Sequence, residues 1–122
     1  MNIEHIRDND VDIAVVSGDG KVIVDTQSAL DLAMTVKYET GAANLVLDKK
    51  LICEDFFILS TGVAGEILQK FVNYQVRAAI YGDYSRYTSK PLKDFIYESN
   101  QGKNFFFTAT KEEAIQKLTQ NI

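Results

Sequence analysis

Two short segments of the chain hold most of the side chains that could bind a ligand or a partner. In the first, Ser60 and Thr61 place two hydroxyls, followed by Gly62 and Gly65, at the start of a predicted helix. The positive end of a helix dipole and the unpaired N–H groups of a first turn favour an anion. This segment is therefore a candidate phosphate site, with the phosphate either bound or covalently attached. The alternative is an ordinary helix start, with a hydroxyl as the N-cap and glycines chosen for packing against a sheet.

The second segment, residues 82–90, contains two tyrosines, three hydroxyl side chains, Asp83, Arg86 and Lys90 within nine positions. Tyr and Arg often anchor protein interfaces, and the basic and hydroxyl groups could also bind an anion. The alternative is a polar loop in which Ser89 only caps the next helix. Across both segments, the candidate binding residues are Ser60, Thr61, Gly62, Gly65, Glu66, Asp83, Tyr84, Arg86, Tyr87, Ser89 and Lys90.

Other residue types argue against several kinds of chemistry. One histidine, His5, and one cysteine, Cys53, are too few for a zinc site of usual composition, and we expect no metal and no cofactor. Cys53 follows two apolar residues and is predicted to be buried packing. The chain contains neither the glycine-lysine phosphate loop nor the dinucleotide glycine fingerprint. The adjacent acids Glu54 and Asp55 point apart in regular structure, so they do not predict shared-proton catalysis. We expect a protein that is not an enzyme.

The composition indicates one globular domain over residues 1–122. Of these residues 46% are hydrophobic and 25% charged, and the net charge of −4 argues against nonspecific binding to nucleic acid. No apolar run reaches the roughly 18–20 residues that span a bilayer, and no secretory signal is visible. We expect a cytoplasmic protein without nucleic-acid or membrane partners. The basic side chains of the second half form either a solvated surface or an anion-facing patch: Arg77, Arg86, Lys90, Lys93 and Lys103.

Apolar periodicity predicts an alternation of strands and helices. Residues 3–7 and 11–15 read as strands that Asp8, Asn9 and Asp10 join into a hairpin, and residues 21–24 as a short third strand. Next come a helix from Asp25 or Thr26 to about Tyr38, a strand at 44–48, a helix with an apolar stripe over 63–72, and a strand at 76–81. The last elements are a helix from Ser89 that stops at Gly102, a strand at 105–107, and a helix that Thr110 and Glu113 open as a capping box.

This order predicts an α/β fold. Strands that are separated by single helices are usually parallel, so we expect a mostly parallel sheet of about five strands, an N-terminal antiparallel hairpin and four helices. Ligands bind outside the carboxyl ends of parallel strands. Because residues 49–61 and 82–90 both follow predicted strands, we expect them to lie on the same edge of the sheet.

The chain also resembles known families. The strand at 44–48, a loop, and then Ser60-Thr61-Gly62-Val63-Ala64-Gly65 resemble the STAS, or anti-sigma-factor antagonist, superfamily, in which Asp-Ser-Ser/Thr-Gly-x-Gly opens a helix. Residues 61–71 and 87–100 are more closely similar to a bacterial family described as domain of unknown function 4180. That second likeness covers essentially the whole chain, and its motifs are long enough to be specific. The resemblance implies a STAS-like α/β domain.

The STAS resemblance implies a regulatory role. In the antagonists a partner kinase phosphorylates one hydroxyl of the motif; Thr61 matches that position and Ser60 is its neighbour. Leu59 stands where the antagonists have an aspartate, and two residues rather than one separate the glycines. We expect a bacterial, non-enzymatic regulatory or protein-interaction module with an unidentified protein partner. Alternatives are a small-ligand (anion)-binding protein, a minor enzyme that uses residues 83–90, and a homodimer through the third helix, where Tyr97 would be exposed.

Overall fold

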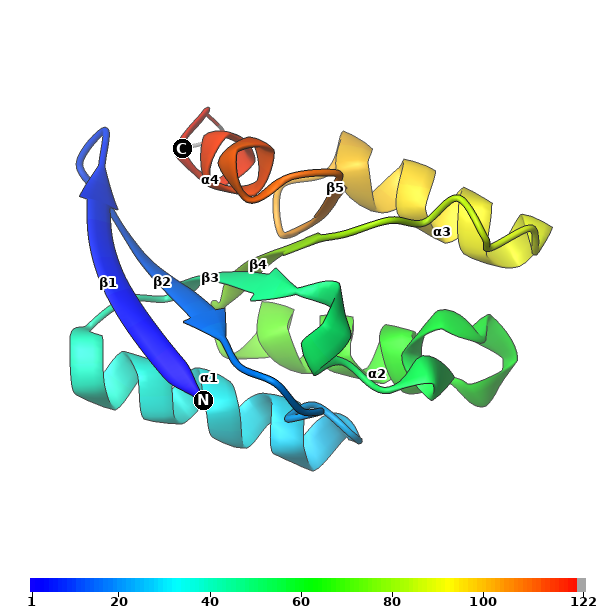
Figure 1. The fold of residues 1–122 in the computed structure, drawn as a ribbon, viewed down its shortest axis with the longest axis horizontal. Helices are drawn as coiled ribbons and strands as arrows, with labels where there is room; N and C mark the ends of the chain where they lie inside the picture. Colours follow the sequence, from blue (N-terminus) through cyan, green and yellow to red (C-terminus); the bar gives the residue numbers. More distant parts are fainter. Residues whose placement is uncertain (121–122) are drawn as a thin grey trace.

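The computed structural model describes residues 1–120, which form a five-stranded sheet and four α-helices (Figure 1). The strands are β1 (Asn2–Asp8), β2 (Val11–Ser17), β3 (Asn44–Asp48), β4 (Arg77–Tyr81) and β5 (Phe105–Thr108). The helices are α1 (Thr26–Thr40), α2 (Val63–Asn73), α3 (Lys90–Gln101) and α4 (Lys111–Gln120). The α/β class, the N-terminal hairpin and the four helices are confirmed.

The strands lie in the sheet in the order in which they occur in the chain. β1 pairs antiparallel with β2, and the other neighbouring pairs are parallel. The hairpin turn consists of Asn9 and Asp10, which both have positive φ angles, 52° and 63°. Asn and Asp tolerate this left-handed conformation, and a turn of two such residues matches the twist of the strands it joins. The predicted hairpin therefore follows directly from its turn residues.

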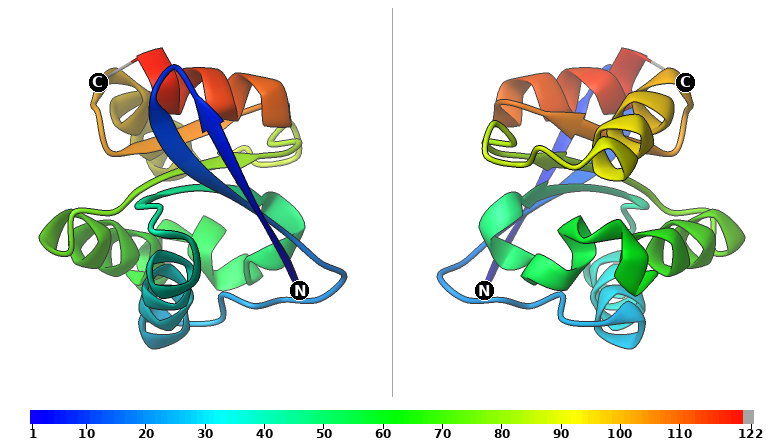
Figure 2. Two further views of the ribbon diagram at one scale, coloured as in Figure 1. Left: turned by 90° about the vertical axis from the view of Figure 1, so that its left-hand side faces the viewer. Right: turned by 90° about the vertical axis from the view of Figure 1, so that its right-hand side faces the viewer.

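Both faces of the sheet are covered, as the apolar strands require. On one face, alternate strand residues pack against α1 and α2, and Leu92 brings α3 into the same cluster. On the other face, Val46, Ala79 and Phe106 pack against Ala114 and Leu118 of α4. Figure 2 shows α1 and α2 on one side of the sheet and α4 on the other. Within residues 1–120, α4 is therefore the only helix on its face.

The helix ends follow the predicted capping residues. The Asp25 side chain accepts the N–H of Ser28 at 2.7 Å, and the Ser28 hydroxyl accepts the N–H of Asp25 at 3.1 Å, so Asp25 and not Thr26 caps α1. α1 continues two residues beyond Tyr38 and ends at Gly41, whose φ is 77°. Ser89 caps α3 by accepting the N–H of Leu92 at 3.4 Å.

One prediction in this part of the chain is wrong. Residues 21–24 form no strand; only Ile23 makes an isolated parallel bridge, with Ile52. The N–H groups of Val22 and Ile23 both donate to the carbonyl of Leu51, at 2.8 and 3.0 Å, which holds this segment in a bend. The N-cap of α2 is Gly62, which has no side chain, and the hydroxyl of the preceding Thr61 accepts the N–H of Val63 at 3.3 Å, so Thr61 makes the predicted contact with the first turn.

The connections that leave β4 and β5 go to opposite faces of the sheet. β4 leads to α3, which packs on the face of α1 and α2, whereas β5 leads to α4 on the other face. The two strands remain joined up to this point, where the N–H of Gly82 donates to the carbonyl of Thr108 at 3.0 Å. Such a divergence leaves room outside the strand ends, and it is where ligands bind in many parallel sheets.

Candidate functional site

Residues 49–61 and residues 82–90 lie side by side at the carboxyl ends of β3 and β4. Residues 49–61 fold as three short 3₁₀ helices, η1 (Lys49–Leu51), η2 (Glu54–Phe57) and η3 (Leu59–Thr61). The ring of Phe57 in η2 stacks on the ring of Tyr87, with centroids 5.2 Å apart and planes at 22°. The predicted shared edge is therefore present, and an aromatic contact joins its two halves.

Polar contacts among Glu54, Arg86 and Tyr87 lie beside this aromatic pair. The guanidinium of Arg86 forms an ion pair with Glu54 and donates to the phenol oxygen of Tyr87 at 3.1 Å. The Tyr87 hydroxyl donates in turn to the second carboxylate oxygen of Glu54 at 3.1 Å. The hydrogen bond to Tyr87 and the nearby charges raise the pKa of Arg86 above its ordinary value. An anion at this edge would compete with Glu54 for the charge of Arg86.

Lys49 completes the group, which we call the Tyr87 cluster: Lys49, Glu54, Phe57, Arg86 and Tyr87. The ammonium of Lys49 lies 4.8 Å from the ring centroid of Tyr87 and 5.3 Å from that of Phe57, within the range of cation–π attraction. Gly82 makes room for it, because a Cβ there would lie 2.6 Å from the Cβ of Lys49. Lys49, Glu54 and Phe57 were missed in the sequence because no periodic pattern marks their contacts with residues 82–90.

Two hollows flank Tyr87. The first, which we call the loop cleft, has a volume of about 330 Å³ and is lined by residues 57–60, 86–89 and Pro91. Ile58, an apolar side chain of this lining, is 51% exposed. An exposed branched side chain next to a stacked aromatic pair provides apolar surface that a partner could cover. The Ser60 hydroxyl group belongs to the same lining.

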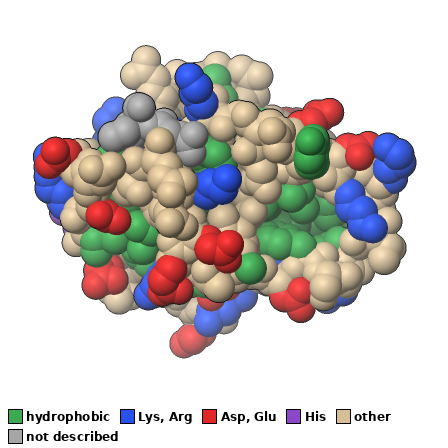
Figure 3. Space-filling model, turned by 90° about the horizontal axis from the view of Figure 1, so that it is seen from above, with side chains coloured by type: hydrophobic (Ala, Val, Ile, Leu, Met, Phe, Trp, Pro, Cys, Tyr) green, Lys and Arg blue, Asp and Glu red, His purple; other side chains and the backbone are tan. Residues whose placement is uncertain are grey.

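The second hollow, the α3 groove, has a volume of about 510 Å³ and lies between the segment that follows β4 and one side of α3. Its lining residues are Tyr84, Ser85, Tyr87, Leu92, Lys93, Ile96, Tyr97 and Asn100. Figure 3 shows apolar side chains gathered in a hollow at the right of the upper face, the end of the molecule where α3 lies in Figure 1. Tyr97 is 67% exposed, in agreement with the expectation from the sequence.

Several predicted residues of the second segment have structural partners. Asp83 accepts the N–H of Ser85 at 2.9 Å, and hydrogen bonding to Ser85 lowers the pKa of Asp83. The Tyr84 hydroxyl donates to the carbonyl of Ile80 at 2.7 Å, and burial raises the pKa of Tyr84 well above its ordinary value. Lys90 pairs with Asp94 at 2.7 Å. Among the candidate residues of 82–90, Arg86 and Tyr87 form hydrogen bonds with Glu54 of residues 49–61.

In the first segment the two hydroxyls differ. The Oγ1 of Thr61 lies 2.7 Å from the carbonyl oxygen of Asp55 and 2.8 Å from that of Ile58, and it accepts the N–H of Val63 at 3.3 Å. Thr61 therefore ties η2 and η3 to the start of α2. Ser60 is exposed, and its side chain forms no hydrogen bond within residues 1–120.

The remaining residues of that segment have simpler explanations. Gly62 has a φ of 81°, which favours glycine, but nothing lies within 4 Å of a Cβ placed at Gly62 or at Gly65. The prediction that these glycines serve close packing against the sheet is therefore wrong. Glu66 accepts the hydroxyl of Thr26 at 2.9 Å and so links α2 to α1. Cys53 is half-buried, and its thiol donates to the carbonyl of Val24 at 3.5 Å.

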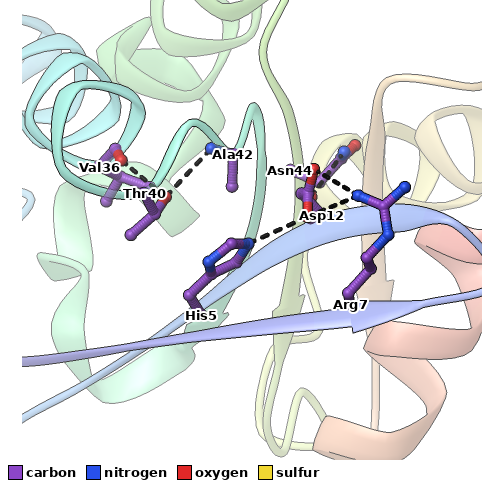
Figure 4. Close-up of polar contacts among 7 residues, drawn as sticks. All are labelled: His5, Arg7, Asp12, Val36, Thr40, Ala42 and Asn44. Atoms are coloured by element: carbon purple, nitrogen blue, oxygen red, sulfur yellow. Dashed lines mark hydrogen bonds and ion pairs between the residues drawn. The ribbon is translucent and has the colours of Figure 1, made fainter.

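A further polar cluster lies on the β1–β2 hairpin, near the opposite edge of the sheet. Figure 4 shows His5 and Arg7 of β1 directed toward Asp12 of β2. His5 lies 3.0 Å from the Asp12 carboxylate, and Arg7 donates to both of its oxygens at 3.1 and 3.0 Å. The hydrogen bond with His5 and then that with Arg7 hold the pKa of Asp12 below its ordinary value. These exposed pairs join the two strands of the hairpin.

Within residues 1–120, no group of three or more His, Cys, Asp and Glu side chains could hold a metal ion. No helix of the same residues is long and apolar enough to cross a bilayer.

Comparison with known proteins gives one match. The model of the family described as Domain of unknown function (DUF4180) matches residues 8–118, from the end of β1 into α4. No curated protein and no solved structure matches the chain. The matched range includes the Tyr87 cluster, the loop cleft and the α3 groove.

Proposed function

The chain belongs to the family described as Domain of unknown function (DUF4180), and we propose that it is a non-enzymatic protein-interaction module whose partner binds at the loop cleft. The observation that carries this proposal is the Tyr87 cluster. Its stacked rings and its ion pair hold two loops together at an edge of the sheet, beside exposed apolar surface.

A surface that is ordered before binding loses less conformational entropy when a partner arrives. Tyr87 is held on its face by Phe57 and at its hydroxyl by Glu54 and Arg86. Buried or half-buried Tyr and Arg side chains are frequent energetic centres of interfaces. Ile58, half-exposed in the same cleft, supplies an apolar anchor.

We also propose that modification of Ser60 or Thr61 regulates this binding, as the resemblance to the STAS antagonists suggests. A phosphate adds a charge of about −2 at neutral pH. On Ser60 it would stand in the lining of the loop cleft. On Thr61 it would remove the hydroxyl proton that Asp55 and Ile58 accept, and it would loosen the start of α2.

The test is a quantitative pull-down from a lysate of the native host with the full chain as bait. Arg86→Ala should lower recovery of specific partners, because it frees Tyr87 and Glu54, and Thr61→Glu should lower it through the added charge. The matched control is Arg7→Ala, which also breaks an exposed ion pair, with Asp12, but on the hairpin. Equal recovery with Arg86→Ala and Arg7→Ala would contradict the proposal.

Small-ligand binding by residues 83–90 is the second candidate function. The observation that favours it is the α3 groove, whose volume of about 510 Å³ lies within the range of about 300–1,000 Å³ of ligand pockets. A homodimer through α3 stays a prediction, which light scattering on the purified chain tests.

A further inference from the structure

We infer that the α3 groove binds a small aromatic carboxylate. This inference rests on the second candidate function, small-ligand binding, and does not require the protein-interaction role. The groove is separated from the loop cleft by Tyr87, which lines both hollows. Binding to one hollow can therefore be measured without binding to the other.

The lining of the groove indicates a flat, apolar ligand. Three of its side chains are tyrosines, and Ile96 adds aliphatic surface. Aromatic rings of a ligand pack favourably against Tyr rings at stacked or edge-on angles. Of the eight described residues that line the groove, none is acidic, although the chain as a whole carries a net charge of −4.

Lys93 supplies the anion-binding group. The other two basic residues of this region are paired, Arg86 with Glu54 and Lys90 with Asp94, whereas the Lys93 ammonium has no carboxylate partner within residues 1–120. Lys93, Tyr97 and Asn100 recur at helical spacing, so they share the side of α3 that faces the groove. A hydrogen bond between an ammonium and a carboxylate is stronger than one between neutral groups.

Both walls of the groove are fixed before a ligand arrives. On one wall, the Tyr84 hydroxyl donates to the carbonyl of Ile80 at 2.7 Å. On the other, the Asn100 amide donates to the carbonyl of Phe107 at 3.2 Å, and its oxygen accepts the N–H of Phe107 at 2.8 Å. These residues are held at the ends of β4 and β5, where the outgoing connections diverge. A rigid hollow at this point of a parallel sheet suits a small ligand better than a mobile chain.

The test uses indole-3-propionate as the probe and its neutral amide, indole-3-propionamide, as the matched control ligand. Both are titrated into the ¹⁵N-labelled full chain and followed by two-dimensional amide spectra. We expect the acid to shift the signals of Ser85 and Tyr97 in the millimolar range or below, and the amide to bind about two- to fivefold more weakly. Lys93→Gln should weaken binding of the acid about two- to fivefold and leave that of the amide unchanged.

The control variant is Lys37→Gln, which removes an exposed ammonium from α1 and should leave both titrations unchanged. Equal binding of the acid and the amide, or no effect of Lys93→Gln, would overturn the carboxylate inference while small-ligand binding stands. If neither probe shifts signals around the groove, the inference fails, while binding of a small ligand of another class by residues 83–90 stands. The pull-down with Arg86→Ala would still test the interaction role separately.

Discussion

Asn100 completes the hydrogen bonding of an outer strand, and removing its side chain should destabilise the fold strongly. β5 is paired only with β4, so its other edge would leave backbone groups without partners. The Asn100 amide bonds both the N–H and the carbonyl of Phe107, at 2.8 and 3.2 Å, and Phe107 is only 5% exposed. In Asn100→Ala two bonds worth about 1 kcal/mol each are lost, and a buried N–H loses its partner, for a total of about 2–4 kcal/mol.

Urea denaturation followed by circular dichroism measures this loss. With an m value of about 2 kcal/mol/M, the unfolding midpoint should fall by about 1–2 M. The matched control is Asn104→Ala, which truncates an exposed Asn that contributes its backbone carbonyl to Ala78 at 3.1 Å. That variant should stay within about 0.5 kcal/mol of the wild type. Equal midpoints for the two variants would refute the assignment of Asn100 as the partner of the β5 edge.

Three further predictions concern single residues. Hydrogen bonds with His5 and then Arg7 lower the pKa of Asp12, so its carboxylate stabilises the fold above its unfolded pKa of 3.8, and this stability is lost as pH falls through the folded pKa. In Asp12→Asn the unfolding midpoint should therefore fall less steeply toward acid pH than in the wild type. An equally steep fall would contradict this. Burial raises the pKa of Tyr84 and keeps its phenol neutral in the fold, so the free energy of unfolding should fall as pH rises above the unfolded pKa of 10.0. Tyr84→Phe should reduce this loss at alkaline pH and should cost about 1 kcal/mol at neutral pH, where the hydrogen bond to Ile80 is removed. Gly62→Ala, at a φ of 81°, should cost about 1–2 kcal/mol, whereas Gly20→Ala should be neutral; equal losses would argue against backbone strain.

Much of the fold could be predicted from local patterns. The Asn9 and Asp10 turn, the Asp25 cap and the stop at Gly41 each depend on residues that are close in sequence, and the structure contains all three. The parallel order of strands follows from single helices between them. Residues 21–24 were predicted wrongly because their alternation is local, whereas the carbonyl of Leu51 that fixes their backbone is distant in sequence.

The candidate site was harder to predict, because its contacts join residues that are distant in sequence. The placement of residues 49–61 beside 82–90 follows from strand order, and it could be foreseen. The partners of Arg86 and Tyr87 could not, because Glu54 and Phe57 lie in 3₁₀ helices that have no apolar period. Hydroxyl residues before a helix predict a contact with its first turn, and the Thr61 hydroxyl makes that contact with Val63. Its hydrogen bonds to two carbonyls of its own loop could not be foreseen, because they depend on the 3₁₀ turns of residues 54–61.

Site-specific crosslinking in the native host tests most directly whether a protein partner binds at the loop cleft. A photoreactive amino acid replaces Ile58, which is 51% exposed in the cleft, or, as a control, Tyr38 of α1, which is 92% exposed. We expect a discrete adduct from position 58 that weakens when Arg86→Ala is added, and no such adduct from position 38. Adducts of equal yield from both positions, or none from position 58, would contradict it.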